Sequence, residues 1–172
     1  MPIRQTTPPI NSVTLENRMK QALILKLQYV GESCVRHARK LPGPPTSIYR
    51  TTTSGKRYAK PNHQPHYADW TANLRSSIGY IVVMDGRIVA KSDFAHEKGK
   101  EGNGEEGRKE GLKYARELAA KYQQGATLIV VAGMNYAAYV QRKGYDVLTS
   151  SELLAEQLVR QLKLNAKITH LQ

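Results

Sequence analysis

The sequence predicts an α+β fold, with a long N-terminal amphipathic helix and C-terminal helices packed on a small, mainly antiparallel sheet. Three patterns support this. Apolar residues recur at helical spacing over 13–40, two Ile- and Val-rich runs flank Asp85-Gly86, and a further apolar run covers 126–132. With 172 residues, 40% of them hydrophobic, the chain is long enough to bury a core as one domain.

The predicted domain covers residues 13–165, between an extended proline-rich arm at 1–12 and a tail at 166–172. Two long loops interrupt it. Prolines and the loss of any periodicity predict a basic loop over 42–70. Glycines and alternating charges predict a mobile, charged Gly-rich loop over 96–111, because that composition leaves little to bury.

The first predicted helix runs from Val13 to about Lys40, and its apolar residues share one face: Leu15, Met19, Leu23, Leu27, Val30, Cys34 and Ala38. Two strands follow, Ser77–Met84 and Arg87–Lys91. Asp85-Gly86 between them predicts a tight hairpin turn, since such turns need residues that accept positive φ.

The second half of the chain continues with a helix expected over 108–122 and an apolar, β-branched run at 126–132 that is typical of a central strand. A short helix is expected within 135–143. The last helix should run from Thr149 to about Leu164, because Thr149 and Glu152 have capping-box spacing before a leucine repeat.

Charge and cysteine content limit the partners and the compartment. Lys and Arg number 26 against 14 Asp and Glu, and the resulting net charge of +12 favours nucleic acid or acidic protein surfaces. Cys34 is the single cysteine, so an intrachain disulfide is excluded, a Cys-based zinc site would lack ligands, and a reducing compartment fits. No segment resembles a signal peptide or a membrane span, so we expect a soluble protein made and used in a cytoplasm.

One motif suggests a dinucleotide site. Residues 102–107 match G-x-G-x-x-G before a predicted helix, but Glu105 and Glu106 would face the pyrophosphate, and the acidic residue expected about 20 positions later is absent. We therefore interpret the segment as a flexible loop.

A divalent metal site at His63, His66 and Asp69 is disfavoured, because no predicted helix or strand would fix these side chains. His37, near the end of the first helix, and Cys34, on its apolar face, are interpreted as structural residues. We therefore predict no catalytic, cofactor-binding or metal site, and no enzymatic activity.

Basic residues with interleaved tyrosines mark the predicted basic loop as a candidate polyanion contact: Arg50, Lys56, Arg57 and Lys60. A solvated loop or a protein interface is the competing interpretation, since tyrosine also serves protein interfaces. Further on, Tyr136 and Tyr139 lie three residues apart, which suits either core packing or the rim of a subunit contact.

Two short blocks carry a resemblance to a known family. Thr71-Ala72-Asn73-Leu74-Arg75-Ser76-Ser77-Ile78 resembles a "T-G-x-L-R-x-S-I" block that leads into a β-hairpin, and Tyr136-Ala137-Ala138-Tyr139-Val140-Gln141 with Gly144 resembles "Y-A-x-Y-V-E-x-G". With the order of elements, these blocks resemble the tail-component or neck proteins of the head–tail junction in long-tailed bacteriophages. Ala72 replaces the usual glycine, and Gln141 replaces the usual glutamate.

The resemblance implies a structural virion protein that connects the capsid portal or connector to the tail tube, as a neck, tail completion or tail terminator protein. Such a protein forms a homo-oligomeric ring, a hexamer or dodecamer, is assembled in the host cytoplasm, meets the passing genomic DNA, and needs no cofactor or membrane. The alternative is a basic nucleic-acid-binding protein. The residues expected to serve folding or subunit contact are Thr71, Leu74, Arg75, Ser77, Ile78, Tyr136, Tyr139, Val140 and Gly144.

Overall fold

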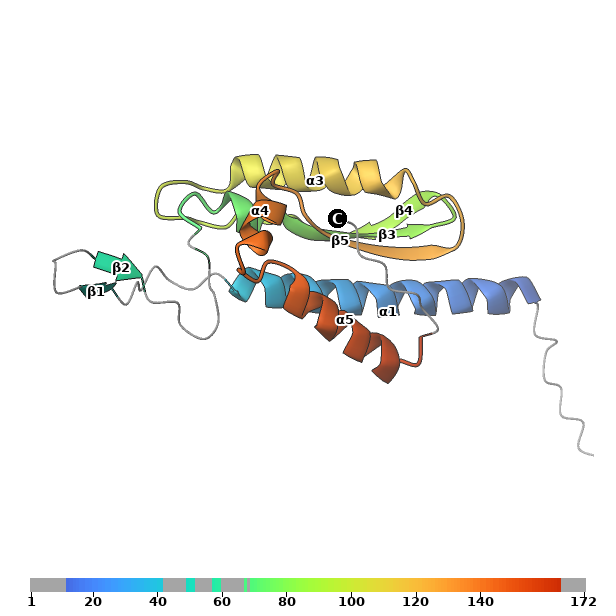
Figure 1. Ribbon diagram of the computed structural model, residues 1–172. Helices are drawn as coiled ribbons and strands as arrows, with labels where there is room; N and C mark the ends of the chain where they lie inside the picture. The colour runs from blue at the N-terminus through green and yellow to red at the C-terminus, as the bar shows by residue number, and fades with distance from the viewer. Residues whose placement is uncertain (1–11, 42–48, 52–56, 60–66, 68, 165–172) are drawn as a thin grey trace, which may run out of the picture.

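The computed structural model has the predicted α+β fold (Figure 1). The described residues are 12–41, 49–51, 57–59, 67 and 69–164. The helices are α1 (Ser12–Lys40), α2 (Asn73–Ser76), α3 (Glu105–Ala119), α4 (Ala137–Arg142) and α5 (Thr149–Gln161). The strands are β1 (Tyr49–Thr51), β2 (Arg57–Ala59), β3 (Ile78–Met84), β4 (Arg87–Lys91) and β5 (Ala126–Ala132).

The body of the molecule has a layered arrangement around an antiparallel sheet of order β4-β3-β5. Helix α3 covers one face of the sheet, while α1 packs against the other face, with α5 packed on α1 (Figure 1). The prediction of a central strand at 126–132 is wrong, because β5 is an edge strand and β3 lies in the centre. The sequences of β3 and β5 are both rich in β-branched residues, so composition alone did not show which of the two is the central strand.

The central strand divides the hydrophobic core in two, because its side chains point alternately to opposite faces. One core cluster lies between β3 and α1 and contains Leu27, Val35, Ala38, Ile78, Tyr80 and Val82. The other lies between the sheet and α3 and contains Ile81, Val83, Phe94, Ala115, Leu118, Ala119, Ile129 and Val131. Six of the seven residues of β3 are buried, as expected for a strand covered on both faces.

The hairpin turn between β3 and β4 is confirmed. Asp85 and Gly86 have φ angles of 48° and 78°, the positive values that a two-residue hairpin turn of this type requires. The turn is also tied to the start of β5. The Gly125 amide donates to the Asp85 carboxylate at 3.0 Å, and the Asp85 amide donates to the Gly125 carbonyl at 2.9 Å.

Helix α1 is buried only in its second half. Every residue of 12–22 is exposed, whereas residues from Leu27 onward pack on the sheet and on α5. Cys34 is a buried free thiol, as predicted, and its Sγ donates to the Ser151 carbonyl at 3.3 Å, while the Ser151 hydroxyl donates to the Cys34 carbonyl at 3.2 Å. His37 has the structural role expected of it, with Nε2 2.9 Å from the Ser150 hydroxyl.

The two predicted loops need correction. Helix α3 begins at Glu105 and not at 108, so the predicted Gly-rich loop over 96–111 is helical in its last part. Within the predicted basic loop over 42–70, β1 and β2 pair antiparallel in a register that the sequence did not predict. Most other residues of that loop lie outside the described residues, as do 1–11 of the predicted arm and the tail.

The C-terminal helix has a different cap from the one expected. Leu148 is the N-cap residue and Thr149 is already helical, so the capping-box assignment is wrong. The Asp146 carboxylate instead accepts a hydrogen bond from the Ser150 amide at 3.2 Å, which satisfies one donor of the first turn. In the described part of the chain, no helix is both long and apolar enough to cross a membrane.

A candidate interface at the junction of α2 and α3

The Thr71–Ile78 block forms the corner that leads through α2 into β3. Leu74 is buried in a cluster with Met134 and Ala137. Ser77 is buried too, and its hydroxyl donates to the Leu74 carbonyl at 2.7 Å. Ile78 lies in the core between β3 and α1. These three candidate residues therefore stabilise the fold in this chain.

The side chain of Arg75 bonds the segments around this corner. Its Nε lies 3.1 Å from the Asp69 carboxylate, which also accepts the Arg75 backbone amide at 3.0 Å. The same guanidinium donates to the Lys98 carbonyl at 3.0 Å. Asp69 is thus committed to Arg75, and His63 and His66 lie outside the described residues. Within the described ranges, no three His, Cys, Asp or Glu side chains gather as a metal site.

The glycines of the Gly-rich motif allow α3 to pack closely on this corner. A Cβ atom at Gly107 would meet the backbone of Asn73, and one at Gly111 would meet the backbone of Ser77, each with carbonyl and Cα atoms closer than 3 Å. Such contacts are too short for any side chain. Gly104, with a φ of 71°, lies against the side chain of Ser76. The glycines therefore allow the backbones of α2 and α3 to touch.

Protein groups already occupy the amide donors at the start of α3. The Glu105 amide donates to the Asn103 side chain at 3.2 Å, and the Gly107 amide donates to the Asn73 side chain at 3.4 Å. A dinucleotide motif would offer these amides to a pyrophosphate. Asn103 and Asn73 take these two donors, and the backbones of Asn73 and Ser77 fill the space beside Gly107 and Gly111, which argues against that use of the motif.

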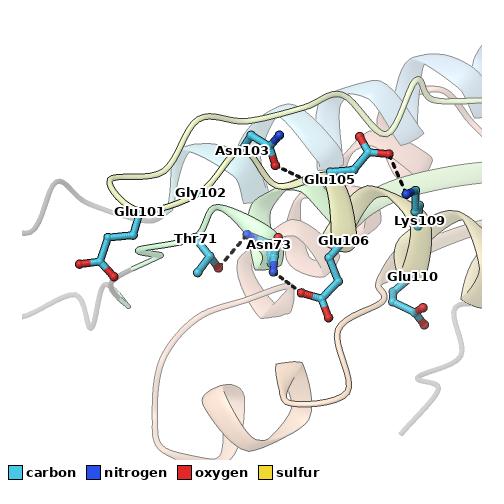
Figure 2. Close-up of a pocket in the computed structure, with 9 residues that line it drawn as sticks. All are labelled: Thr71, Asn73, Glu101, Gly102, Asn103, Glu105, Glu106, Lys109 and Glu110. Atoms are coloured by element: carbon cyan, nitrogen blue, oxygen red, sulfur yellow. Dashed lines mark hydrogen bonds and ion pairs between the residues drawn. The ribbon is translucent and has the colours of Figure 1, made fainter.

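A hollow of about 550 Å³ opens beside this corner (Figure 2). We call it the acidic hollow, and it is lined by Thr71, Asn73, Glu101, Gly102, Asn103, Glu105, Glu106, Lys109 and Glu110. Four glutamates face one lysine in this lining, although the whole chain carries a net charge of +12. The acidic hollow therefore attracts positively charged groups.

The glutamates of the acidic hollow differ in their partners. Glu105 is engaged by His96, Arg108 and Lys109, at 2.9, 3.2 and 3.4 Å. The hydrogen bond from Arg108 is the main reason why the pKa of Glu105 lies below its usual range. Glu106 accepts only the Asn73 amide, at 2.7 Å (Figure 2), and neither it nor Glu101 forms a salt bridge with the described basic residues.

Two aromatic side chains lie beside the acidic hollow, next to Thr71 in sequence or in space. Tyr136 is 36% exposed. Burial raises the pKa of Tyr136 to about 12, and the charges of Asp69 and Glu106 add to the rise. Trp70 is 42% exposed, with the Lys100 ammonium 4.9 Å from its ring. The two family-like blocks meet in space, because Leu74 and Ala137 lie in the same buried cluster.

The remaining candidate residues of the second block lie further along α4. Tyr139 is 55% exposed, and the Lys143 ammonium lies 5.3 Å from its ring. Val140 packs partly buried beside the cluster around Leu74. Gly144 has a φ of 86° and lies just beyond α4, so it serves the turn. Of the candidate residues in this block, Tyr136 and Tyr139 are the large exposed ones.

The candidate polyanion contacts are only partly described. Arg50 lies in β1 and Arg57 in β2, on paired strands. Lys56 and Lys60 lie outside the described residues. Contact between this segment and a polyanion stays a prediction.

Sequence reasoning missed a second exposed surface. Helix α1 carries exposed apolar side chains at steps of three and four residues, which we call the outer stripe: Leu15, Met19, Ala22, Leu25 and Tyr29. Its four large members are between 48% and 66% exposed. The prediction that Leu15 and Met19 belong to the buried apolar face is wrong, because both are exposed. This surface could have been predicted from the sequence, because apolar residues on a second face of a helix indicate a second packing partner.

Comparisons with known proteins add no relative: no protein-family model matches the chain, and no curated protein or solved structure is significantly similar to it. The functional assignment therefore depends on the resemblance of the two sequence blocks and on the surfaces just described.

Proposed function

We propose that this chain is a structural protein of the phage head–tail junction, which assembles with copies of itself into a ring between the portal or connector and the tail tube. In this role the chain acts by binding other proteins. The resemblance of the Thr71–Ile78 and Tyr136–Gly144 blocks to neck proteins motivates the proposal.

The observation that carries the proposal is the contact between the two blocks. They are about 60 residues apart in sequence, yet Leu74 and Ala137 pack in one buried cluster. Two motifs that a family shares are expected to meet when they form one structural unit. The α+β body and the long N-terminal helix also fit the fold that the resemblance implies.

The exposed surfaces support an assembling protein. The outer stripe leaves large apolar side chains in water, and such surfaces usually mark protein contacts. The sheet is also open at β4 and at β5 in the described structure, and an open strand edge can accept a strand from another chain.

Deletion of the gene from the phage that encodes this chain tests the proposal. DNA-filled heads and complete but separate tails should accumulate, because each part assembles without the junction. Supplying the wild-type chain should restore joined, infectious particles. Electron microscopy of the lysate makes the distinction, and normal joined particles from the deletion phage would refute the proposal.

The net charge of +12 favours the second candidate, a nucleic-acid-binding protein. That function predicts that the isolated chain binds random duplex DNA, with an affinity that falls steeply as salt rises. The junction protein is expected to shift DNA weakly or not at all at physiological salt. A gel-shift titration over a range of salt concentrations separates the two.

A further inference from the structure

We propose that the ring is held by a head-to-tail contact, in which the exposed first half of α1 from one copy docks into the acidic hollow of the next copy. This inference rests on the proposed function, since it names the interface between the copies. Three observations support it: the exposed apolar side chains of the first half of α1, the charge of this segment, and the positions of the two surfaces in the molecule.

The donor is the segment 12–22 of α1, where every residue is exposed. It carries large apolar side chains that touch no core, among them Leu15 at 48% and Met19 at 64% exposure. A helical segment of this length measures about 16 Å, enough to lie across a small pocket. An apolar helix face of this kind gains stability when a partner removes it from water.

The charge of the donor is opposite to that of the acidic hollow. The first turn of α1 contains no acidic residue. Arg18 adds positive charge, whereas Lys20 forms an ion pair with Glu16 at 2.8 Å, so the stretch has two basic residues against one acidic residue. The hollow presents Glu101 and Glu106 without salt bridges to described basic residues.

The acceptor also offers apolar contacts. Trp70 and Tyr136 lie beside the acidic hollow and are partly exposed, so they can pack against Leu15 and Met19 while the glutamates meet Arg18. Aromatic anchors with a charged surround are common at protein interfaces.

The positions of donor and acceptor suit a ring. The first residues of α1 lie at one end of the molecule, and the start of α3, which lines the acidic hollow, lies at the opposite end (Figure 1). Two different, complementary patches at opposite ends give a head-to-tail contact, which forms a closed ring when the rotation between copies is suitable. A two-fold dimer would require a self-complementary patch instead.

Paired charge reversals of the full chain test the contact. The hollow variant carries Glu101→Lys and Glu106→Lys, at exposed positions. The helix variant carries Arg18→Glu and Lys20→Glu, also exposed. Each alone should assemble at least tenfold more weakly than wild type, measured by sedimentation velocity over a range of protein concentrations, because like charges would then face each other.

The decisive measurement is an equimolar mixture of the two variants. Each contact in an alternating ring again joins opposite charges, so assembly should return to near the wild-type level. Recovery on mixing also shows that both variants are folded. A control that changes the net charge by the same amount as the helix variant, at other exposed positions, is Lys121→Glu with Arg142→Glu. It should assemble like wild type.

The outcomes separate the two proposals. If the wild type assembles and both reversed variants assemble equally well, or if the mixture fails to recover, the head-to-tail contact is wrong while the ring proposal stands. If the wild-type chain stays monomeric at every concentration, the ring and the contact are both wrong.

Discussion

At the scale of single residues, glycine has a structural role at the α2–α3 junction. Gly107 and Gly111 lie one helical turn apart on the face of α3 that touches Asn73 and Ser77. Alanine at an ordinary helix position is more favourable than glycine by about 1 kcal/mol. The chain forgoes that stabilisation here because a side chain would separate the two backbones.

The substitution Gly111→Ala is therefore expected to destabilise the protein, although alanine has a higher helix propensity than glycine. The added methyl group would overlap the Ser77 backbone, and overpacking of this kind costs about 1 to 3 kcal/mol. Urea unfolding measures the change. Lys113→Ala, at an exposed position of the same helix, should be nearly neutral. Equal or greater stability of Gly111→Ala would contradict the packing of α3 on α2.

The buried thiol of Cys34 makes the stability of the protein depend on pH in the alkaline range. Burial raises the pKa of its thiol to about 11, from an ordinary value of 9.0. Because the folded pKa is higher than the unfolded one, the thiol's contribution to stability is complete below about pH 9 and declines as the pH rises toward 11.

The free energy of unfolding should thus fall between about pH 9 and 11, and it should fall less steeply in Cys34→Ala, which lacks the thiol. Denaturant titrations at several pH values measure both slopes. Tyr80 and Tyr136, whose pKa values are raised to about 12, contribute mainly at higher pH and are present in both proteins. Parallel slopes for the two proteins would show that the thiol is not buried.

At the scale of elements, the hairpin turn organises the sheet because Asp85 serves both the turn and β5. Asp85→Ala should lower the free energy of unfolding by about 1 kcal/mol, since it removes a hydrogen bond and places alanine at positive φ. Asp85→Asn should cost less, because asparagine accepts positive φ and keeps an acceptor oxygen. Thermal unfolding of the two variants gives the comparison, and equal losses would argue against the link to Gly125.

The elements with strong local signals were predictable from sequence. Asp85-Gly86 marked the hairpin, and the helical repeat marked α1, because turn chemistry and periodicity act over a few residues. The central position of β3 was not predictable, since it depends on α1 and α3 covering both of its faces. The start of α3 was also missed: glycines that normally indicate a loop are used here at helical spacing to fit a distant backbone.

The candidate site was predictable only in part. The sequence named the Thr71–Ile78 block and the tyrosines of the Tyr136–Gly144 block, and the structure brings the two blocks together through Leu74 and Ala137. It could not place Glu101 and Glu106 beside Thr71, because that contact joins segments 30 residues apart through the glycine packing. The acidic hollow is therefore a product of the fold.

At the scale of the whole molecule, charge is unevenly distributed. A chain with a net charge of +12 concentrates four glutamates around one hollow, while an apolar half-helix with basic side chains projects from its other end. Uneven charge of this kind orients copies as they approach and penalises other arrangements. Assembly should accordingly weaken as salt concentration rises, since exposed charges are screened.

The central claim, that this chain acts by assembling with itself, is tested most directly by electron microscopy of the purified full chain together with its mass in solution. The account predicts closed rings, with a mass that is a single multiple of the 19.3 kDa chain. A particle of 19.3 kDa at all concentrations, with no rings on the grid, would contradict it.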